Sequence, residues 1–471
     1  MNKSKKKVLG AIIGILAFII IGFIVPPFGS LESAGMKALG IICLTISLLT
    51  GQCLPDYASF ILMCTLAVVF HVVPIGTAFG AFAGSTFWLI IGILGLGAGI
   101  NKSGLLKRLS LKVMTLFPPN FRGMTAALLG VGTVFAPLMP STSAKQAIMG
   151  PVAMGIGATL GFEKKSKGMA GMFNAMYIGW CVTGTIFLSA SFLTPIILGV
   201  LPTDVQSQFS WTPYFVGMIP WCIVLFVLSY FGLTIIYKPE TNNKITKDYI
   251  KSQIKELGPM SREEKVSLIV LIICIGLWMT ESMHHISTFI VAIGGFIALI
   301  AFGVFASGEF QTKLPWGLIF MVGGIMNMAP ILTYNHVDKW LGKLIEPLIS
   351  GLLSQTYLFV LVVILFTYAI RFVIPADLIT PMVLVTTMLT PIVQLAGWNP
   401  WIIAIVTYCS VNIWCTIYQN GVFLVGWAAC GGDEQNDFSK VKNASWMFMF
   451  INIIGLLISI PYWKMLGYIP K

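Results

Sequence analysis

The stretch Phe135-Ala-Pro-Leu-Met-Pro-Ser-Thr-Ser-Ala-Lys-Gln-Ala147 decides how this chain can fold. A largely apolar run, 124–136, leads into it, and a second one, 147–160, leads out of it. Between them stand two prolines, three hydroxyl residues and Lys145. In lipid every backbone N–H and C=O needs a partner, and irregular backbone is tolerated only against protein or a water-filled cavity. We therefore expect the tip of a re-entrant hairpin, lining a binding site.

The composition is that of a membrane protein. The 471 residues are 57% hydrophobic and 10% charged, with a mean hydropathy of +0.90, whereas soluble proteins carry about 25% charged residues. The net charge of +12 would suggest a nucleic-acid partner in a soluble chain, but cytoplasmic loops of membrane proteins collect Lys and Arg. We expect no nucleic-acid partner. The nine cysteines show no paired spacing, which favours small core residues over disulfides or a metal site.

The N-terminus predicts a first crossing and its direction. Lys3, Lys5, Lys6 and Lys7 precede an apolar run, 8–25, which is long for a signal peptide and is followed by two prolines instead of a small-residue cleavage site. We interpret the run as a transmembrane helix. Because basic residues favour the cytoplasmic side, we expect a multi-pass protein of the plasma membrane with a cytoplasmic N-terminus.

Apolar runs recur along the chain, and a crossing helix needs about 20 apolar residues. We expect about eleven, at 8–25, 34–53, 57–73, 85–104, 168–200, 213–237, 266–280, 286–305, 316–332, 400–430 and 444–463. The fifth and tenth are too long for one simple crossing and contain polar residues, so we expect broken helices there. The one long hydrophilic segment, 238–265, is expected to be a cytoplasmic linker.

The two halves of the chain share one order of elements. Each has a span that starts near a tryptophan (Trp88 and Trp316), a short arm, a hairpin with a proline-flanked polar tip, and a broken span. Interrupted segments at corresponding positions of two halves are typical of secondary transporters. The expected division is 1–83 as scaffold helices, 84–237 as a first repeat with hairpin 121–160, 238–265 as linker, 266–430 as a second repeat with hairpin 355–395, and 431–471 as a C-terminal loop and last helix.

Charge placement gives the topology. With the N-terminus in the cytoplasm, the basic segments 105–117, 163–167, 238–265 and 431–442 all fall inside. The two hairpins then enter the membrane from opposite sides. The expected fold is an all-α polytopic membrane protein of about 11 transmembrane helices plus two re-entrant hairpins in an inverted repeat.

The first tip favours an anion. Ser141, Thr142 and Ser143 can cap the half-helix that follows Pro140, and its free N–H groups and positive dipole end favour negative charge. Lys145 lies one turn further on, and a lysine near the bilayer centre costs at least ~2.5–3.5 kcal/mol. It is expected to contact the anion; the alternatives are that it snorkels or pairs with a carboxylate such as Asp377.

The second tip repeats this geometry with an acid, and its residues are Pro375, Ala376, Asp377 and Thr380. Asp377 is a natural N-cap. An acid beside an anion would repel it unless it is protonated, paired or holding a cation, so the alternative is a coupling-ion site. Arg371, four residues before Pro375, is either a second anion clamp or a snorkelling residue.

Polar residues in the two broken spans are further candidates. Ser and Thr in membrane helices most often bond back to their own backbone, and the alternative is that they line the site. We assign Thr183, Thr185 and Asn420 to the substrate, with Ser141, Thr142, Ser143, Lys145, Ala376, Asp377 and Thr380. Gly184 and Thr416 join Asp377 as coupling-ion candidates. Other polar residues of the broken spans are Ser189, Ser191, Asn412, Tyr418 and Gln419.

Enzyme motifs are weak. Glu281, His284 and His285 fall in a short loop, which favours a plain loop over a metal site, and the topology separates them from Asp377. The segment Gly95-Leu-Gly-Ala-Gly99 indicates helix packing, because no soluble βαβ context surrounds it. We expect no catalytic residue, no bound metal and, since no P-loop is present, no ATP-driven transport by this chain alone.

These features resemble the divalent anion/sodium symporter family of di- and tricarboxylate carriers. Pro140-Ser-Thr-Ser-Ala-Lys145 is similar to the family's first tip, which carries Ser-Asn-Thr. Thr183-Gly-Thr-Ile-Phe-Leu-Ser-Ala-Ser191 is similar to the fifth helix of its citrate/succinate and 2-oxoglutarate/malate exchangers. The family's Asn, which helps to bind sodium and substrate, is replaced by Thr142 and Asp377. A basic residue at Lys145 resembles the exchanger branch, where a fixed positive charge replaces a bound cation.

The resemblance and the residues together imply a secondary carrier that exchanges small divalent organic anions, di- or tricarboxylates. The alternative is a sodium- or proton-coupled symporter of dicarboxylates, or of another divalent anion such as sulfate or tartrate; a channel is a further class. No cofactor is expected, apart from Na⁺ in the symporter alternative. The resemblance also implies a homodimer in the lipid bilayer and elevator-like movement.

Overall fold

The computed structural model describes residues 3–29, 31–139, 141–239, 248–374 and 377–470. All regular secondary structure in this part of the chain is helical, as expected. Eight of its helices are long and apolar enough to cross a membrane: Lys7–Ile24, Ser33–Gly51, Ser85–Ser103, Phe121–Leu138, Trp211–Ile236, Trp316–Tyr334, Thr356–Val373 and Phe438–Met465. The other expected crossings are shorter, interrupted or charged at one end. The number of crossings therefore does not follow from helix length and composition alone.

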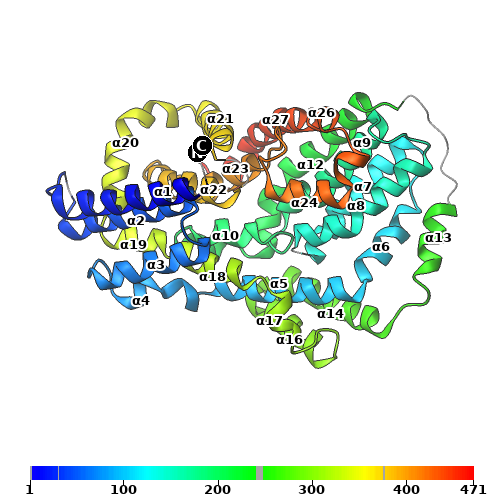
Figure 1. Ribbon diagram of the computed structural model, residues 1–471, viewed down its shortest axis with the longest axis horizontal. Helices are drawn as coiled ribbons and strands as arrows, with labels where there is room; N and C mark the ends of the chain where they lie inside the picture. Colours follow the sequence, from blue (N-terminus) through cyan, green and yellow to red (C-terminus); the bar gives the residue numbers. More distant parts are fainter. Residues whose placement is uncertain (1–2, 30, 140, 240–247, 375–376, 471) are drawn as a thin grey trace.

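One group of helices forms the left and lower part of the view in Figure 1, and we call it the frame group. Its long members are α1 (Lys3–Ile19, extended by a π-helical turn Ile20–Ile24), α2 (Ser33–Gly51), α3 (Asp56–Val69), α5 (Ser85–Ser103), α14 (Arg262–Met279), α16 (Thr288–Ala301), α18 (Trp316–Ile325) and α19 (Met328–Tyr334). Short helices join them: α4 (Ile75–Ala78), η2 (Gly80–Ala83), α15 (Glu281–His284) and α17 (Glu309–Lys313).

Glycines bring two frame helices close together. A Cβ atom on Gly92 would lie 2.8 Å from the backbone of Ala292, and one on Gly95 would lie 2.5 Å from the ring of Phe296. Small residues let membrane helices approach closely where lipid supplies no hydrophobic drive. These glycines therefore account for the packing of α5 on α16.

A second group, the core group, occupies the upper part of the same view (Figure 1). It contains two helix pairs, two interrupted helices and two long single helices. The members are α7 (Phe121–Phe135) with α8 (Thr142–Thr159), α9 (Lys167–Tyr177) with η4 (Ile178–Val182), η5 (Thr183–Ile186) and α10 (Leu193–Gly199), α12 (Trp211–Ile236), α21 (Thr356–Val373) with α22 (Ile379–Leu395), α23 (Trp401–Val411) with α24 (Gly421–Ala429), and α27 (Asn443–Met465).

The same packing occurs in both halves of the core group. α7 packs on α9 and α12, and α21 packs on the corresponding helices α23 and α27. α8 packs on α9 and on α24, and α22 packs on α23 and on α10. Each helix pair therefore contacts the interrupted helix of its own half and the second segment of the interrupted helix of the other half.

The two interrupted helices lie side by side with opposite directions. Near the start of the first, the ring of Phe173 lies 5.7 Å from that of Trp427, near the end of the second. Beside the interruptions, the hydroxyls of Thr194, at the start of α10, and Tyr408, near the end of α23, are 3.1 Å apart. The interruptions consequently face one another in the middle of the core group.

Two arms connect the two groups, and short segments join helices within the core group. The arms are α6 (Leu105–Met114) and α20 (Val337–Leu353), and the short segments are α11 (Thr203–Gln208), α25 (Gly432–Gln435) and α26 (Phe438–Val441). The segment expected to be a solvated linker contains a helix, α13 (Asp248–Glu256), which packs on α6 and buries Ile250. The span expected at 316–332 is interrupted between α18 and α19, where buried Asn327 accepts a hydrogen bond from the backbone of Ala81.

Candidate functional site

The first tip lies between α7 and α8. Ser141 caps α8, its hydroxyl accepting a hydrogen bond of 3.2 Å from the backbone N–H of Ala144. Thr142 is buried, and its Oγ1 has no hydrogen-bond partner among the described residues. Ser143 is exposed, and Pro140 lies outside the described residues. The start of α8 therefore presents a capped helix N-terminus with one unpaired buried hydroxyl.

Lys145 points from α8 into the interruption between η5 and α10. Its side chain is fully buried, and Nζ donates a hydrogen bond of 2.7 Å to the carbonyl of Ala190. Gly184 leaves it room, since a Cβ there would lie 3.4 Å from Nζ. The ion pairs of the described residues are Lys102–Glu309, Arg108–Glu264 and Lys440–Asp437, so Lys145 belongs to none of them. A buried positive charge thus has a carbonyl partner and no carboxylate partner.

The hydroxyls of the first interruption bond to backbone carbonyls. Thr183 donates to Gly179 at 2.6 Å, and Thr185 donates to Val182 at 2.9 Å. Ser189 donates to Pro137 at 3.2 Å and so joins the interruption to the first tip. Back-bonding of this kind is the ordinary role of Ser and Thr in membrane helices.

The second tip lies between α21 and α22. Asp377 Oδ1 accepts hydrogen bonds from the backbone N–H groups of Ile379 (2.8 Å) and Thr380 (3.3 Å), as an N-cap does. Thr380 is partly exposed, whereas Ala376 and Pro375 lie outside the described residues.

Arg371 is fully buried and bonds only to backbone carbonyls among the described residues. Its guanidinium donates to Val411 at 3.0 Å and to Ile374 at 2.8 Å, and also to the carbonyls of Asp377 and Gln419. The five donors of an arginine suit such a fork. The side chain therefore ties the end of α21, the second tip and the interruption between α23 and α24 together.

The second interruption is capped in the same manner as the tips. Asn420 is buried and accepts hydrogen bonds from the backbone of Val422 (3.0 Å) and Phe423 (3.2 Å) at the start of α24. Gln419 Oε1 accepts from the backbone of Cys415 at 2.7 Å. Thr416 is exposed.

Two basic side chains thus bind carbonyls at corresponding places, although Lys145 lies after the first tip, on α8, and Arg371 lies before the second, on α21. Lys145 binds the carbonyl of Ala190, just before α10, and Arg371 binds that of Gln419, just before α24. Carbonyls that lack a helical hydrogen bond at an interruption carry partial negative charge, which both cations offset. The N-terminal ends of α8 and α22 add partial positive charge at the two tips, which suits an anion.

The structure brings the predicted residues together in two sets. Lys145 and Gly184 meet at the first interruption, and Arg371, Asp377 and the residues around Asn420 meet at the second. Gln146 links the sets, since its Nε2 donates to the carbonyl of Val422 at 2.9 Å while its Oε1 has no partner among the described residues. The sequence could have indicated Gln146, because this residue is an amide within the polar stretch 135–147.

Asp56 is a second residue that the sequence interpretation missed. It is the first residue of α3, in the frame group, and its carboxylate lies close enough to that of Asp377 for the two to repel each other electrostatically. The frame group therefore adds an acid beside the second tip. A single acid at the start of a helix is an ordinary feature, so nothing in its local sequence marks it.

Comparison with known proteins identifies a family that matches nearly the whole chain. Residues 5–469 match the family described as the sodium:sulfate symporter transmembrane region. The L-tartrate/succinate antiporter of Escherichia coli strain K12 is 24% identical over 308 residues, which are 63% of this chain and 61% of that protein. A membrane protein of Cupriavidus necator is 23% identical over 275 residues, 58% of this chain and 54% of that protein. These matches span less than two thirds of the relatives' lengths.

A solved structure shares the fold. The YdaH transporter of Alcanivorax borkumensis, whose crystal structure was described as having an unusual topology, superposes with a TM-score of 0.56. The superposition covers 99% of each chain at 13% sequence identity. At this identity the likeness concerns the arrangement of helices alone.

Proposed function

We propose that the chain, which belongs to the sodium:sulfate symporter family, is a secondary transporter of small divalent organic anions that works by exchange. The substrate class we propose is a di- or tricarboxylate. The name of the Escherichia coli relative, an L-tartrate/succinate antiporter, supports both the class and the mode. Transport, and not catalysis, is the activity that we propose for the site.

The observation that carries this proposal is the state of Lys145. A lysine that is fully buried, with a carbonyl partner and no carboxylate partner among the described residues, is costly in a membrane. A carboxylate of the substrate would lower that cost. Ser141, Thr142, Ser143, Thr380 and the N-terminal ends of α8 and α22 would supply hydrogen-bond donors to the rest of the anion, with Thr183, Thr185 and Asn420 around them.

The same charge supports exchange over one-way transport. An empty carrier would have to move with Lys145 uncompensated, which is unfavourable. A loaded carrier moves with that charge offset by the anion. The return movement therefore requires a second anion, and no separate cation is needed to balance the substrate.

A sodium- or proton-coupled symporter is the second candidate, and one observation favours it. Asp56, an exposed acid, and Asp377 interact electrostatically near the second tip. Like charges in such a place favour a bound cation or a shared proton. In this alternative Asp377, with Gly184 and Thr416, would serve the coupling ion.

The recurring contacts of the core group support an inverted repeat. We infer units α2–α12 and α14–α27, each with five crossings and one re-entrant helix pair. The frame helices match as well, because α2 packs on α3 as α14 packs on α16, and α3 packs on α18 as α16 packs on α5. Because five is an odd number of crossings, the second unit would start on the opposite side of the membrane and have the opposite orientation. With α1, the total would be eleven crossings. These units differ from the repeats expected from the sequence, which begin at residues 84 and 266, because α2 and α3 correspond to α14 and α16.

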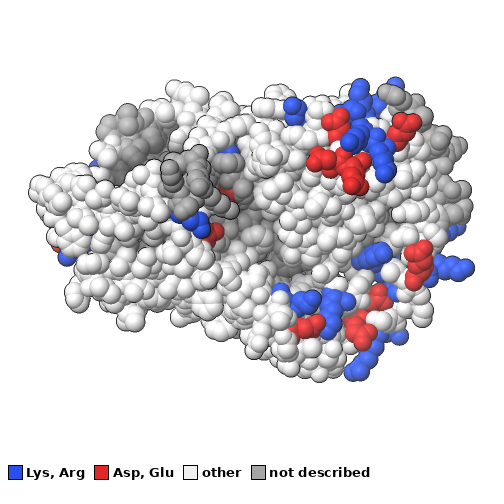
Figure 2. All heavy atoms as spheres, viewed as in Figure 1, with Lys and Arg blue, Asp and Glu red and all other residues white. Residues whose placement is uncertain are grey.

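We propose that the protein lies in the plasma membrane with its N-terminus in the cytoplasm. The distribution of charge supports this orientation. On the face shown in Figure 2, most charged side chains gather at the right-hand end, which carries α9, α13 and α26. The lysine-containing segments 163–167 and 437–442 lie there, joined by a hydrogen bond of 2.6 Å from Lys440 to the carbonyl of Lys165. A homodimer with elevator-like movement of the core group against the frame group completes the proposal.

A counterflow screen tests the function. Purified protein in vesicles preloaded with succinate, malate, citrate, 2-oxoglutarate, tartrate or sulfate would be supplied with labelled substrate, with and without sodium. We expect saturable, sodium-independent uptake that depends on an internal carboxylate. A strict sodium requirement would favour the symporter, and uptake that does not saturate would favour a channel.

A further inference from the structure

Two helices from different halves of the chain, α8 and α24, lie side by side in the core group (Figure 1). Near their starts, Nε2 of Gln146 on α8 donates a hydrogen bond of 2.9 Å to the carbonyl of Val422 on α24. Further along, a Cβ on Gly150 would lie 3.1 Å from Sγ of Cys430, just after α24. Contacts that advance together along both helices mean that α8 and α24 run in the same direction. The first tip, at the start of α8, therefore lies beside the second interruption, at the start of α24.

Gln146 is the polar link between these two starts. Its side chain is fully buried, and its Nε2 also donates to the carbonyl of Thr142, in the first turn of α8, at 3.3 Å. It follows Lys145 directly, and its partner Val422 is itself held by the Asn420 cap through a hydrogen bond of 3.0 Å. Polar side chains that bond across membrane helices hold those helices in a defined relative position. One amide thus ties the turn that carries Lys145 to the turn that Asn420 caps.

A glycine determines how closely the two helices approach. A Cβ on Gly426 would lie 1.8 Å from Oε1 of Gln146, so a larger residue at this position would force the amide out of its place or the helices apart. Small residues allow such close approach between membrane helices. Gln146 and Gly426 together therefore determine the distance between the first turns of α8 and α24.

That distance also separates the two sets of residues in the proposed anion site. Lys145, on α8, serves the first interruption through the carbonyl of Ala190. The second set lies at the start of α24, where Arg371 binds the carbonyl of Gln419 and Asn420 caps the helix. A divalent anion that contacts both sets must have its two carboxylates at a matching separation. One methylene more or less in a fitted site changes the discrimination between substrates by about tenfold or more.

We propose that Gln146 is a positioning residue which, with Gly426, sets the chain length of the dianion that the carrier accepts. The inference rests on the proposed function, because it requires an anion bound between the two sets. Gln146 acts through the placement of α8 against α24 and needs no contact with the anion. A residue that only stabilised the fold would affect all substrates alike, whereas a positioning residue changes the preference among them.

The test is the counterflow rate of each dicarboxylate from malonate to adipate, at concentrations well below saturation, in vesicles preloaded with the same anion. In Gly426→Ala the new Cβ moves α8 away from α24, so we expect the rate for glutarate relative to succinate to rise by about threefold or more. Gln146→Met keeps the size of the side chain and removes its N–H donors, so we expect the profile of rate against chain length to become broader. Adding Gln146→Asn to Gly426→Ala shortens the amide by one methylene, and we expect it to restore the wild-type profile.

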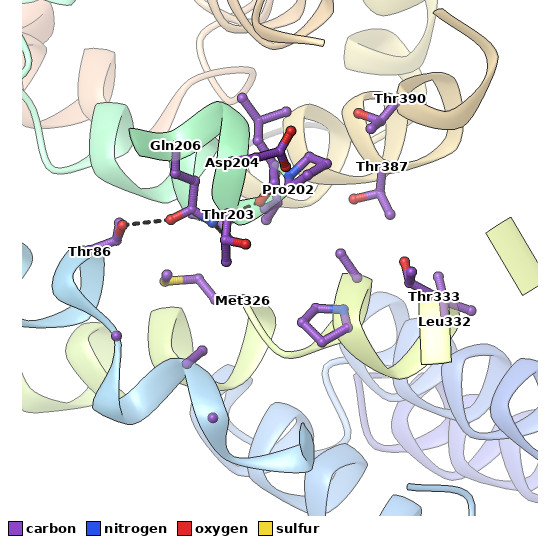
Figure 3. Close-up of a pocket in the computed structure, with 18 of the residues that line it drawn as sticks. Thr86, Pro202, Thr203, Asp204, Gln206, Met326, Leu332, Thr333, Thr387 and Thr390 are labelled. Carbon is purple, nitrogen blue, oxygen red and sulfur yellow. Dashed lines mark hydrogen bonds between the residues drawn. The ribbon is translucent and has the colours of Figure 1, made fainter. Parts of the chain in front are cut away.

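Two controls apply the same substitutions elsewhere. Gln206→Met removes an amide that accepts a hydrogen bond of 2.9 Å from Thr86, at a cavity between the frame and core groups whose described lining includes no residue of either tip (Figure 3). Gly276→Ala adds a Cβ on α14 where the described residues leave open space. We expect neither variant to change the profile of rate against chain length.

The outcomes separate the positioning role from its alternatives. A profile that stays unchanged in both Gly426→Ala and Gln146→Met would overturn the inference. Rates that fall equally for all chain lengths, together with a lower Tm, would show a packing role only and would overturn it as well. If Gly426→Ala does not fold, the profile of Gln146→Met decides alone. A wild-type protein that exchanges none of these dianions would instead refute the proposed function, and the positioning role with it.

Discussion

The ammonium nitrogen of Lys145 lies 2.7 Å from the carbonyl oxygen of Ala190, and the lysine side chain is fully buried. The contact joins α8 to the interruption of the neighbouring helix. It offsets part of the lysine charge, since a carbonyl carries only partial negative charge. A substrate carboxylate would complete the pairing.

The first prediction concerns Lys145→Met, which keeps the length of the side chain and removes its charge. We expect anion exchange to fall by at least about tenfold, because a hydrogen bond between charged groups contributes roughly 1.5–3 kcal/mol. We expect Tm to be unchanged or higher, since the empty protein no longer buries an unpaired charge. Counterflow and thermal unfolding measure the two effects.

The control for this variant is Lys112→Met, which removes an exposed lysine from the arm α6. It should change neither exchange nor Tm. If Lys145→Met lost exchange and stability in parallel, Lys145 would have a structural role only. Near-normal exchange would remove it from the site.

The second prediction concerns Arg371, whose guanidinium serves four backbone carbonyls. Arg371→Met would leave the carbonyls of Ile374, Asp377 and Gln419 without this donor, at a cost of about 1–3 kcal/mol for each one that stays buried and unpaired. The carbonyl of Val411 keeps a hydrogen bond of 3.0 Å from the backbone N–H of Ile413. We expect a clear fall in Tm, in contrast to Lys145→Met. Arg371→Lys should restore little of it, because a lysine lacks the planar fork. A stable Arg371→Met protein that has lost only transport would contradict this structural role and would make Arg371 an anion clamp.

The third prediction concerns Asp377→Asn. Asn and Asp are about equally good N-caps, so the hydrogen bonds to Ile379 and Thr380 should persist and Tm should change little. The negative charge opposite Asp56 is lost, so the pH and cation dependence of transport should change more than the preference among substrates. Transport assays over a range of pH, with and without sodium, would measure this. An unchanged profile would leave Asp377 as a cap.

Much of the helix order follows from the sequence because prolines and polar residues interrupt apolar runs in few ways. The breaks between α7 and α8 and between α21 and α22 lie at the two proline-flanked stretches. Capping by Ser141 and Asp377 also follows from local chemistry, since a cap needs only its own next few residues.

The partners of the basic residues could not be predicted in this way. Lys145 and Ala190 are 45 residues apart, and Arg371 and Gln419 are 48 apart. Which carbonyl each side chain meets depends on how a helix pair packs on an interrupted helix, which spacing along the chain does not determine.

The helix α13 was missed for another reason. Its apolar residues Ile250 and Ile254, with Leu257 just beyond its end, recur with helical spacing, but charged residues dominate the composition of that segment.

The last prediction concerns Arg108, which holds the linker against the arm α6. Its side chain donates to Glu264 at 2.7 Å and to the carbonyls of Leu257, Gly258 and Pro259, at the point where α13 gives way to α14. Arg108→Met would release these carbonyls and leave Glu264, itself buried, without its cation. We expect α13 to detach and trypsin to cleave after Lys251 and Lys255 several-fold faster. Lys112→Met, on the exposed face of the same arm, is the control and should leave cleavage unchanged. Equal cleavage of the Arg108→Met and wild-type proteins would mean that the packing of α13 on α6 holds the linker without this arginine.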